Sequence, residues 1–205
     1  VERRQLMKAY GAELVLTEGA RGMGGAIERA KELLESTPGA WMPDQFNNPA
    51  NARAHYETTG PELWRDTDGG VDVLVAGVGS GGTITGVGAE LRSVFPAMQI
   101  WAAEPEHAAL LSGGAIGTHV QMGIGDGILP AIMDTSLIDG IVVVTDEEAL
   151  ACARRLAREE GLFCGISSGA NVAAALRLAR KLGPDKTVVT LAPDTGERYF
   201  STVLF

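Results

Sequence analysis

The feature that most constrains the fold is a buried strand that runs into a glycine-rich turn and then a helix. Residues 71–76 (VDVLVA) form a β-branched apolar run, of the kind buried on both faces of a parallel sheet. Residues 77–82 (GVGSGG) interrupt this run, and residues 83–95 have the periodicity of a helix. A strand, a tight turn and a helix in this order predict one unit of an α/β protein.

The same alternation continues to the end of the chain. Further strands are expected at residues 99–104, 141–144 and 187–191, with helices at 145–161 and 167–183. Single helices between strands predict an α/β fold with a mostly parallel sheet and helices on both faces. Upstream, we expect helices at 1–10, 22–36 and 49–64, and short strands at 12–16 and 40–42. The connector at 43–49, with a proline at each end, is the best internal boundary.

Charge and composition exclude several classes of function. Twenty-six acidic residues against seventeen basic ones give a formal net charge of −9, and only 5% of residues are aromatic. A nucleic-acid partner is not expected, because such binding needs a basic contact face. No apolar run is long enough to cross a membrane. Cys152 and Cys164 do not have the spacing of zinc ligands and have no histidines nearby in the sequence, so no metal is expected. The few cysteines also lead us to expect a reducing, cytoplasmic compartment.

The glycine-rich turn predicts a phosphate site. It lies where a parallel strand ends, glycines let the backbone approach an anion, and the next helix presents its N-terminus. The hydroxyls of Ser80 and Thr83 add donors that suit a terminal phosphate. Gly77, Gly79 and Gly82 also match G-x-G-x-x-G, with Glu104 placed as a ribose-binding acid would be. This motif alone therefore does not decide whether the ligand is a nicotinamide dinucleotide or a group with a terminal phosphate.

Four motifs in order resolve this choice through a resemblance. They are QFNNPAN at residues 45–51, the glycine turn at 77–83, FCGISSGA at 163–170 and PDTGERY at 193–199. Together they resemble the cysteine synthase (O-acetylserine sulfhydrylase) family, which consists of pyridoxal-phosphate enzymes with the tryptophan synthase β-subunit type of fold. The likeness runs along the whole chain.

The resemblance implies the roles of particular residues. The cofactor's phosphate would be held by Gly79, Ser80, Gly81, Gly82 and Thr83. Ser167, otherwise interpretable as a helix N-cap, would face the pyridine nitrogen, where a neutral hydroxyl suits β-elimination. Gln45 and Gly125 would contact the substrate. Asp126 stands where many family members have alanine, and we interpret it as an exposed loop acid.

The resemblance also implies that part of the enzyme is absent. Its Schiff-base lysine has a Ser-x-Lys-Asp setting, which none of Lys8, Lys31, Lys181 and Lys186 shares. All four are expected on the surface, so we expect no catalytic residue in this chain and no turnover by the chain alone. We expect 1–48 to be a remnant of the smaller mobile domain, 49–205 to be the larger cofactor-cradling domain, and the lysine to lie upstream of Val1.

For the complete enzyme, the resemblance implies cysteine biosynthesis, in which sulfide replaces the acetate of O-acetylserine. It also implies a homodimer and a possible partner in the C-terminal peptide of serine acetyltransferase. The alternative with the same cofactor-binding site is that the chain forms the core of a cystathionine β-synthase or of an O-phosphoserine sulfhydrylase. Outside this chemistry stand a nicotinamide-binding Rossmann enzyme and a binding module without catalysis.

Overall fold

The computed structural model describes all residues from 1 to 205, and the chain divides into two compact units. The first comprises residues 1–44 and the second residues 45–205. The division therefore falls inside the connector at 43–49. None of the helices combines the length and the apolar character that a bilayer-spanning helix needs.

The first unit is helical and has almost no buried residues. It contains α1 (Glu2–Ala9), a single 3₁₀ turn (Gly19–Arg21) and α2 (Gly22–Ser36). Gly25 is the only residue of these helices that is buried. The strands expected at 12–16 and 40–42 are wrong: both segments lie outside any strand. A strand needs a neighbour for its backbone hydrogen bonds, and no strand of this unit lies beside either segment.

The second unit begins with three helical segments that follow one another without a break. They are α3 (Ala50–Ala54), a π-helical segment (His55–Thr59) and α4 (Gly60–Asp66). The sequence predicted one helix here. The π-helical segment is the difference, and such segments are rare and occur frequently at functional sites.

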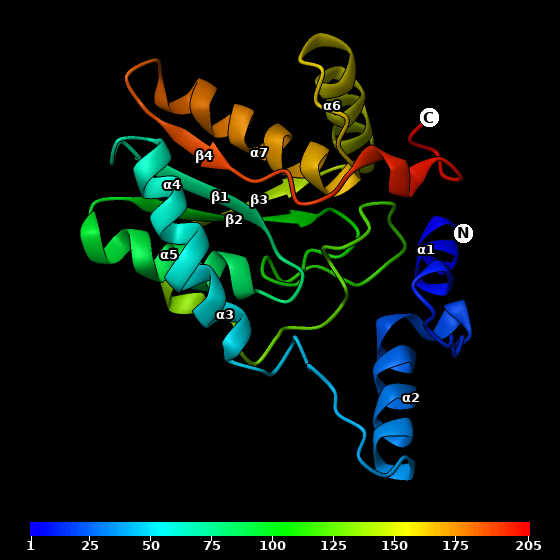
Figure 1. Ribbon diagram of the computed structural model, residues 1–205. Coiled ribbons are helices and arrows are strands. Elements are labelled where there is room, and N and C mark those ends of the chain that lie inside the picture. Colours follow the sequence, from blue (N-terminus) through cyan, green and yellow to red (C-terminus); the bar gives the residue numbers. More distant parts are fainter. The chain divides into compact units, whose positions relative to one another are not determined.

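A four-stranded parallel sheet forms the centre of the second unit (Figure 1). Its strands are β1 (Val73–Gly77), β2 (Gln99–Pro105), β3 (Gly140–Val144) and β4 (Val188–Thr190), in the spatial order β3-β2-β1-β4. In the register, Val73 faces Gln99 on one side of β1 and Val188 on the other. Because all strands run the same way, their carboxyl ends share one edge.

Both faces of the sheet are covered, as the sequence predicted. Val73 and Val75 pack in one apolar cluster with residues of α6 (Asp146–Glu159) and α7 (Ile166–Leu182). Leu74 and Ala76 pack on the other face with residues of α5 (Gly82–Val94). Figure 1 shows α6 and α7 on one side of the sheet and α3, α4 and α5 on the other. The period-two alternation along β1 thus divides its side chains between two cores.

The ends of α6 and α7 follow from local sequence. Thr145 and Glu148 form the predicted capping box: each side chain accepts a hydrogen bond from the other residue's backbone N–H, at 3.1 and 3.0 Å. Helix α7 ends at Leu182 and is followed by its C-cap, Gly183, which has a φ of +91°. Between β2 and β3 the chain is irregular apart from one 3₁₀ turn (Thr135–Leu137), as expected for 105–139.

Candidate functional site

The carboxyl edge of the sheet brings together the segments that the sequence singled out. The glycine turn follows β1, Glu104 stands near the end of β2, and the segment around Asp194 follows β4. Ligands of open parallel sheets collect at this edge. The N-termini of α5 and α7 complete it.

The glycine turn leads into a helix N-terminus that no side chain caps. Gly81 is the N-cap of α5, has a φ of +77° and leaves the first turn without a side-chain hydrogen bond. This conformation favours glycine, and a Cβ at Gly81 would also lie 2.8 Å from Cβ of Met133. The first turn carries no acidic residue. Its N–H groups are therefore suited to an anion.

Ser80 is held by a side chain that also reaches the connector. Nδ2 of Asn51 donates to Oγ of Ser80 at 3.0 Å and to the carbonyl oxygen of Gln45 at 2.8 Å. Because Ser80 accepts this bond, its hydroxyl proton is directed elsewhere. The same amide places the backbone of Gln45 beside the glycine turn, while the Gln45 residue as a whole is exposed.

Thr83 contacts a histidine of the π-helical segment. Nε2 of His55 lies 3.2 Å from Oγ1 of Thr83, and Nδ1 lies 3.0 Å from Oγ1 of Thr59. Burial lowers the pKa of His55, which favours the neutral imidazole. Sequence reasoning missed both His55 and Asn51, although Asn51 stands inside one of the four motifs.

Gly125 lies against the glycine turn and belongs to a loop that hydrogen bonds fix in place. Its N–H donates to the carbonyl oxygen of Val78 at 2.9 Å, and its own carbonyl lies 3.0 Å from Nε2 of His119. The next residue, Asp126, is partly buried instead of exposed, which corrects the interpretation from sequence. Burial raises the pKa of Asp126, and the nearby His119 partly opposes this shift.

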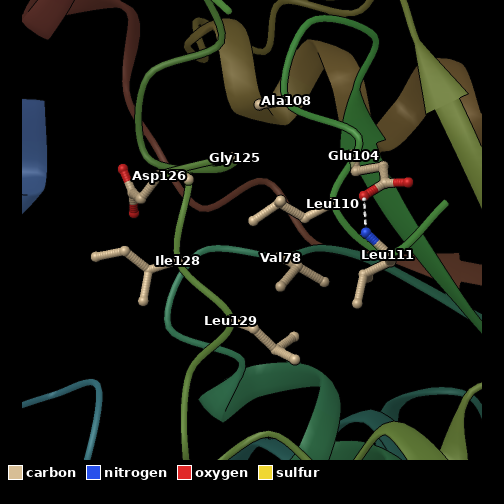
Figure 2. A pocket seen from close by; sticks show the side chains of 10 residues that line it. Val78, Glu104, Ala108, Leu110, Leu111, Gly125, Asp126, Ile128 and Leu129 are labelled. Carbon is tan, nitrogen blue, oxygen red and sulfur yellow. Dashed lines mark hydrogen bonds between the residues drawn. The ribbon is translucent and has the colours of Figure 1, made fainter. Parts of the chain in front are cut away.

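Glu104 does not take the role that a dinucleotide would require. Its side chain is buried, and its two carboxylate oxygens accept hydrogen bonds from the N–H groups of Leu111 and Ser112, each at 2.9 Å. Figure 2 shows Glu104 among the residues that line a small pocket, together with Val78 and Asp126. A dashed line marks the hydrogen bond from the N–H of Leu111 to Glu104. The carboxylate thus anchors the turn at 110–112, and the geometry does not favour ribose binding.

Ser167 lies in the first turn of α7 and is 3% exposed. It is not the N-cap: that position belongs to Gly165, which has no side chain to cap the helix. The cap comes instead from Asp194, a residue distant in sequence, whose carboxylate accepts the N–H groups of Ser167 and Ser168 at 3.2 and 2.9 Å. Asp194 belongs to the motif at 193–199, but no role for it was predicted from the sequence.

Asn171 connects Ser167 to the glycine turn. It follows Ser167 by one helical turn, so both side chains lie on the same face of α7. Oδ1 of Asn171 accepts the N–H of Gly77 at 2.7 Å, and Nδ2 donates to the carbonyl oxygen of Leu191 at 2.9 Å. The structure thereby joins α7 to the end of β1. It brings together Gly79, Ser80, Gly81, Gly82, Thr83, Gly125 and Ser167 at this edge.

The lysines of the second unit lie away from this edge. Nζ of Lys186 pairs with Oδ1 of Asp72 at 2.7 Å, before the start of β1, whereas the glycine turn follows its end. Lys181 lies fourteen residues after Ser167 on α7, about 21 Å along the helix, over the ring of Trp101. Lys8 and Lys31 belong to the first unit and are exposed. All four lysines are therefore surface residues, as expected.

Comparison with known proteins adds two relationships by sequence. The model of the pyridoxal-phosphate dependent enzyme family matches residues 1–194. Cysteine synthases from Staphylococcus aureus strains Mu50 and N315 are each 50% identical over 205 residues, which cover all of this chain and 66% of each enzyme. The chain thus spans slightly less than two thirds of these relatives.

Solved structures agree with the sequence relationships. An O-acetylserine dependent cystathionine beta-synthase from Helicobacter pylori has a TM-score of 0.94 at 39% identity, covering 100% of this chain and 66% of that one. The cysteine synthase (OASS) of Entamoeba histolytica has a TM-score of 0.92 at 42% identity, covering 100% and 61%. With a family model that matches nearly the whole chain, we conclude that this chain belongs to the pyridoxal-phosphate dependent enzyme family.

Proposed function

We propose that this chain supplies the cofactor-cradling part of a cysteine synthase, which replaces the acetate of O-acetylserine by sulfide. The observation that carries the proposal is the uncapped N-terminus of α5, with Ser80 and Thr83 beside it, joined through Asn171 to Ser167. The identity of 50% to cysteine synthases over the whole chain supports this substrate class. In this proposal, residues 49–205 are the larger domain and 1–48 belong to the smaller, mobile one.

The donors of the glycine turn fit a phosphate group. The first-turn N–H groups of α5 have no side-chain cap and no acidic neighbour in that turn. Ser80 accepts from Asn51, which leaves its hydroxyl proton free to donate to an anion. We assign the phosphate of pyridoxal phosphate to a set of five residues, Gly79, Ser80, Gly81, Gly82 and Thr83. Charge-assisted bonds of this kind contribute roughly 1.5–3 kcal/mol each.

The ring end of the cofactor is assigned to Ser167. When bound, pyridoxal phosphate supplies the electron withdrawal that allows a substrate to lose its α-proton and its β-substituent. Ser167 presents a neutral hydroxyl to the ring nitrogen, and its position in the first turn of α7 keeps that hydroxyl away from water. A carboxylate at this place would instead favour a protonated ring.

Substrate contacts are assigned to Gln45 and Gly125. The backbone of Gln45 is tied to Ser80 through Asn51, so a substrate carboxylate near the connector would lie close to the phosphate site. Gly125 also lies against the turn, because its N–H donates to the carbonyl oxygen of Val78. We propose that these two segments orient O-acetylserine and admit sulfide.

We further propose that none of the four lysines forms a covalent link to the cofactor. Lys186 is paired with Asp72 at the opposite edge of the sheet, and Lys181 lies at the far end of α7. The chain alone would then bind pyridoxal phosphate reversibly and would not turn over. For the complete protein we propose a cytoplasmic homodimer, and a C-terminal peptide of serine acetyltransferase as a partner.

A chimaera tests the proposed function. The 205 residues of the Staphylococcus aureus cysteine synthase that align with this chain are replaced by this chain. We expect the chimaera to form cysteine from O-acetylserine and sulfide. Its matched control carries Ser80→Ala together with Thr83→Val, and we expect it to lose most of this activity and to need more pyridoxal phosphate.

Two further assays distinguish the related activities. O-phosphoserine with sulfide tests a phosphoserine enzyme, and O-acetylserine with homocysteine tests a cystathionine β-synthase. A chimaera that folds and binds the cofactor, but prefers either of these pairs, would contradict the proposed substrates. A folded chimaera that does not bind pyridoxal phosphate would contradict the assigned cradle itself.

A further inference from the structure

Helix α7 takes its N-terminal cap from a buried carboxylate distant in sequence. Asp194 is 7% exposed. Its Oδ1 accepts the N–H of Ser168 at 2.9 Å, and its Oδ2 accepts the N–H of Ser167 at 3.2 Å. The backbone of the same residue is also held, because its carbonyl oxygen accepts the N–H of Gly165 at 3.0 Å. Asp194 is therefore fixed against three residues of the α7 N-terminus.

Two hydroxyl groups complete the environment of this carboxylate. Oγ of Ser168 donates to Oδ1, and the phenol of Tyr199 donates to Oδ2 at 2.5 Å. None of the ion pairs of the structure includes Asp194. Burial alone would raise the pKa of Asp194, but hydrogen bonds from Ser168, Tyr199 and Ser167 outweigh it and the pKa lies below its ordinary value. The charge is thus stabilised by donors and by the helix dipole.

The close approach of Asp194 depends on a glycine. A Cβ at Gly165 would lie 2.2 Å from Oδ2 of Asp194 and 2.2 Å from a ring carbon of Tyr199. Any other residue would push the carboxylate away from the first turn of α7. An ordinary serine or threonine cap at position 165 is therefore incompatible with this arrangement.

The network fixes α7 at two points, the first turn that contains Ser167 and the following turn at Asn171. Asp194 holds the backbone of Ser167 itself, and Asn171 holds the next turn to Gly77 at the glycine turn. A hydroxyl that must meet a ring nitrogen needs this kind of support, because a displacement of about 1 Å weakens a hydrogen bond greatly.

We propose that Asp194 is a positioning residue, whose carboxylate fixes the Ser167 hydroxyl against the pyridine nitrogen of the cofactor. This inference rests on the proposed function, in which Ser167 faces that nitrogen. Asp194 itself does not touch the cofactor in this account. It acts by holding the N–H of Ser167.

Two nuclei of the cofactor separate this role from general stability. The full chain is loaded with pyridoxal phosphate carrying ¹⁵N in the ring, and the ¹⁵N and ³¹P resonances are recorded for the wild type, Asp194→Asn and Ser167→Ala. The ³¹P shift reports the phosphate site, and the ¹⁵N shift reports the hydrogen bond to the ring. We expect Asp194→Asn to keep the bound ³¹P shift and to move the ¹⁵N shift toward that of Ser167→Ala.

Hydrogen exchange gives a second measure that needs no cofactor. In Asp194→Asn the amides of Ser167 and Ser168 lose charge-assisted acceptors, so we expect them to exchange about tenfold faster while the amides of β1 keep their rates.

The double variant Asp194→Asn with Ser167→Ala is expected to show the same ¹⁵N shift as Ser167→Ala alone. That result would mean that Asp194 acts on the ring only through Ser167.

The outcomes are distinguishable. A wild type without a bound ³¹P resonance overturns the proposed cofactor site, and this inference with it. A bound ³¹P resonance with an unchanged ¹⁵N shift in Asp194→Asn overturns the positioning role alone. If Asp194→Asn does not fold, Tyr199→Phe removes one donor from Oδ2 and is expected to shift ¹⁵N in the same direction by a smaller amount. An unchanged shift there overturns the inference as well.

Discussion

The backbone N–H of Gly77 donates a hydrogen bond to Oδ1 of Asn171 at 2.7 Å, which joins the last residue of β1 to α7. The side chain of Asn171 is buried, and its Nδ2 bonds to Leu191 beyond β4. One amide therefore satisfies a partly buried donor at the end of β1 and a partly buried acceptor just after β4. It ties the end of β1, where the glycine turn begins, to the helix that carries Ser167.

Replacing this amide is expected to destabilise the second unit strongly. Asn171→Ala leaves the partly buried N–H of Gly77 and the partly buried carbonyl of Leu191 without this partner. We expect a loss of roughly 2–4 kcal/mol in the free energy of unfolding, measured by urea denaturation. The exposed helix residue Arg180 provides a control, and Arg180→Ala is expected to change the stability little. Equal stability of both variants would contradict the assigned role.

The conformation of Gly81 is expected to matter for cofactor binding as well as for stability. Gly81→Ala places a Cβ at a φ of +77° and 2.8 Å from Met133, so we expect a loss of roughly 1–3 kcal/mol and weaker binding of pyridoxal phosphate in a titration. Gly161 is a matched control, because it has a φ of +70° and open space around its Cβ position. Gly161→Ala should cost less and leave the affinity unchanged.

The partly buried Asp126 is expected to make stability fall as the pH rises. Burial raises its pKa in the folded state above the ordinary value of 3.8, so the folded chain binds this proton more tightly than the unfolded chain does. The stabilisation is complete below pH 3.8 and is lost as the pH rises through the folded pKa. Asp126→Asn should remove this slope in urea unfolding at several pH values. A slope in the variant as steep as in the wild type, or steeper, would refute the assignment.

Asp194 is expected to have the opposite pH dependence. Its pKa is lowered in the folded state, because its hydrogen bonds outweigh the effect of burial, so its stabilisation is present above pH 3.8 and is lost as the pH falls through the folded pKa. The stability difference between the wild type and Asp194→Asn should shrink on acidification. A difference that stays constant down to acid unfolding would show that the carboxylate charge contributes nothing.

The sequence predicted the parts of the fold that depend on local periodicity. The run at 71–76, the strands that follow it and the capping box of Thr145 are all present, because burial on both faces of a sheet leaves a direct pattern in the sequence. The strands expected at 12–16 and 40–42 were wrong. Short apolar runs are ambiguous, and a strand forms only where another strand supplies its hydrogen bonds.

The part of the site that backbone groups form could be predicted from the sequence. The part that depends on contacts between side chains far apart in the sequence could not. The glycine turn is readable because glycines and a helix start are adjacent in sequence. The contacts of His55 with Thr83 and of Asp194 with Ser167 join residues 28 and 27 positions apart. No local pattern marks such pairs, and only the folded sheet brings their segments to one edge.

The most direct test of the account is a titration of the chain with pyridoxal phosphate, followed by borohydride reduction and mass spectrometry. We predict saturable binding of pyridoxal phosphate, for which inorganic phosphate competes. The double variant Ser80→Ala with Thr83→Val should abolish this binding, and reduction should leave no cofactor attached at a specific lysine. The absence of saturable binding would contradict the phosphate site. Stoichiometric attachment at Lys8, Lys31, Lys181 or Lys186 would contradict the proposal that this chain holds the cofactor without a covalent link.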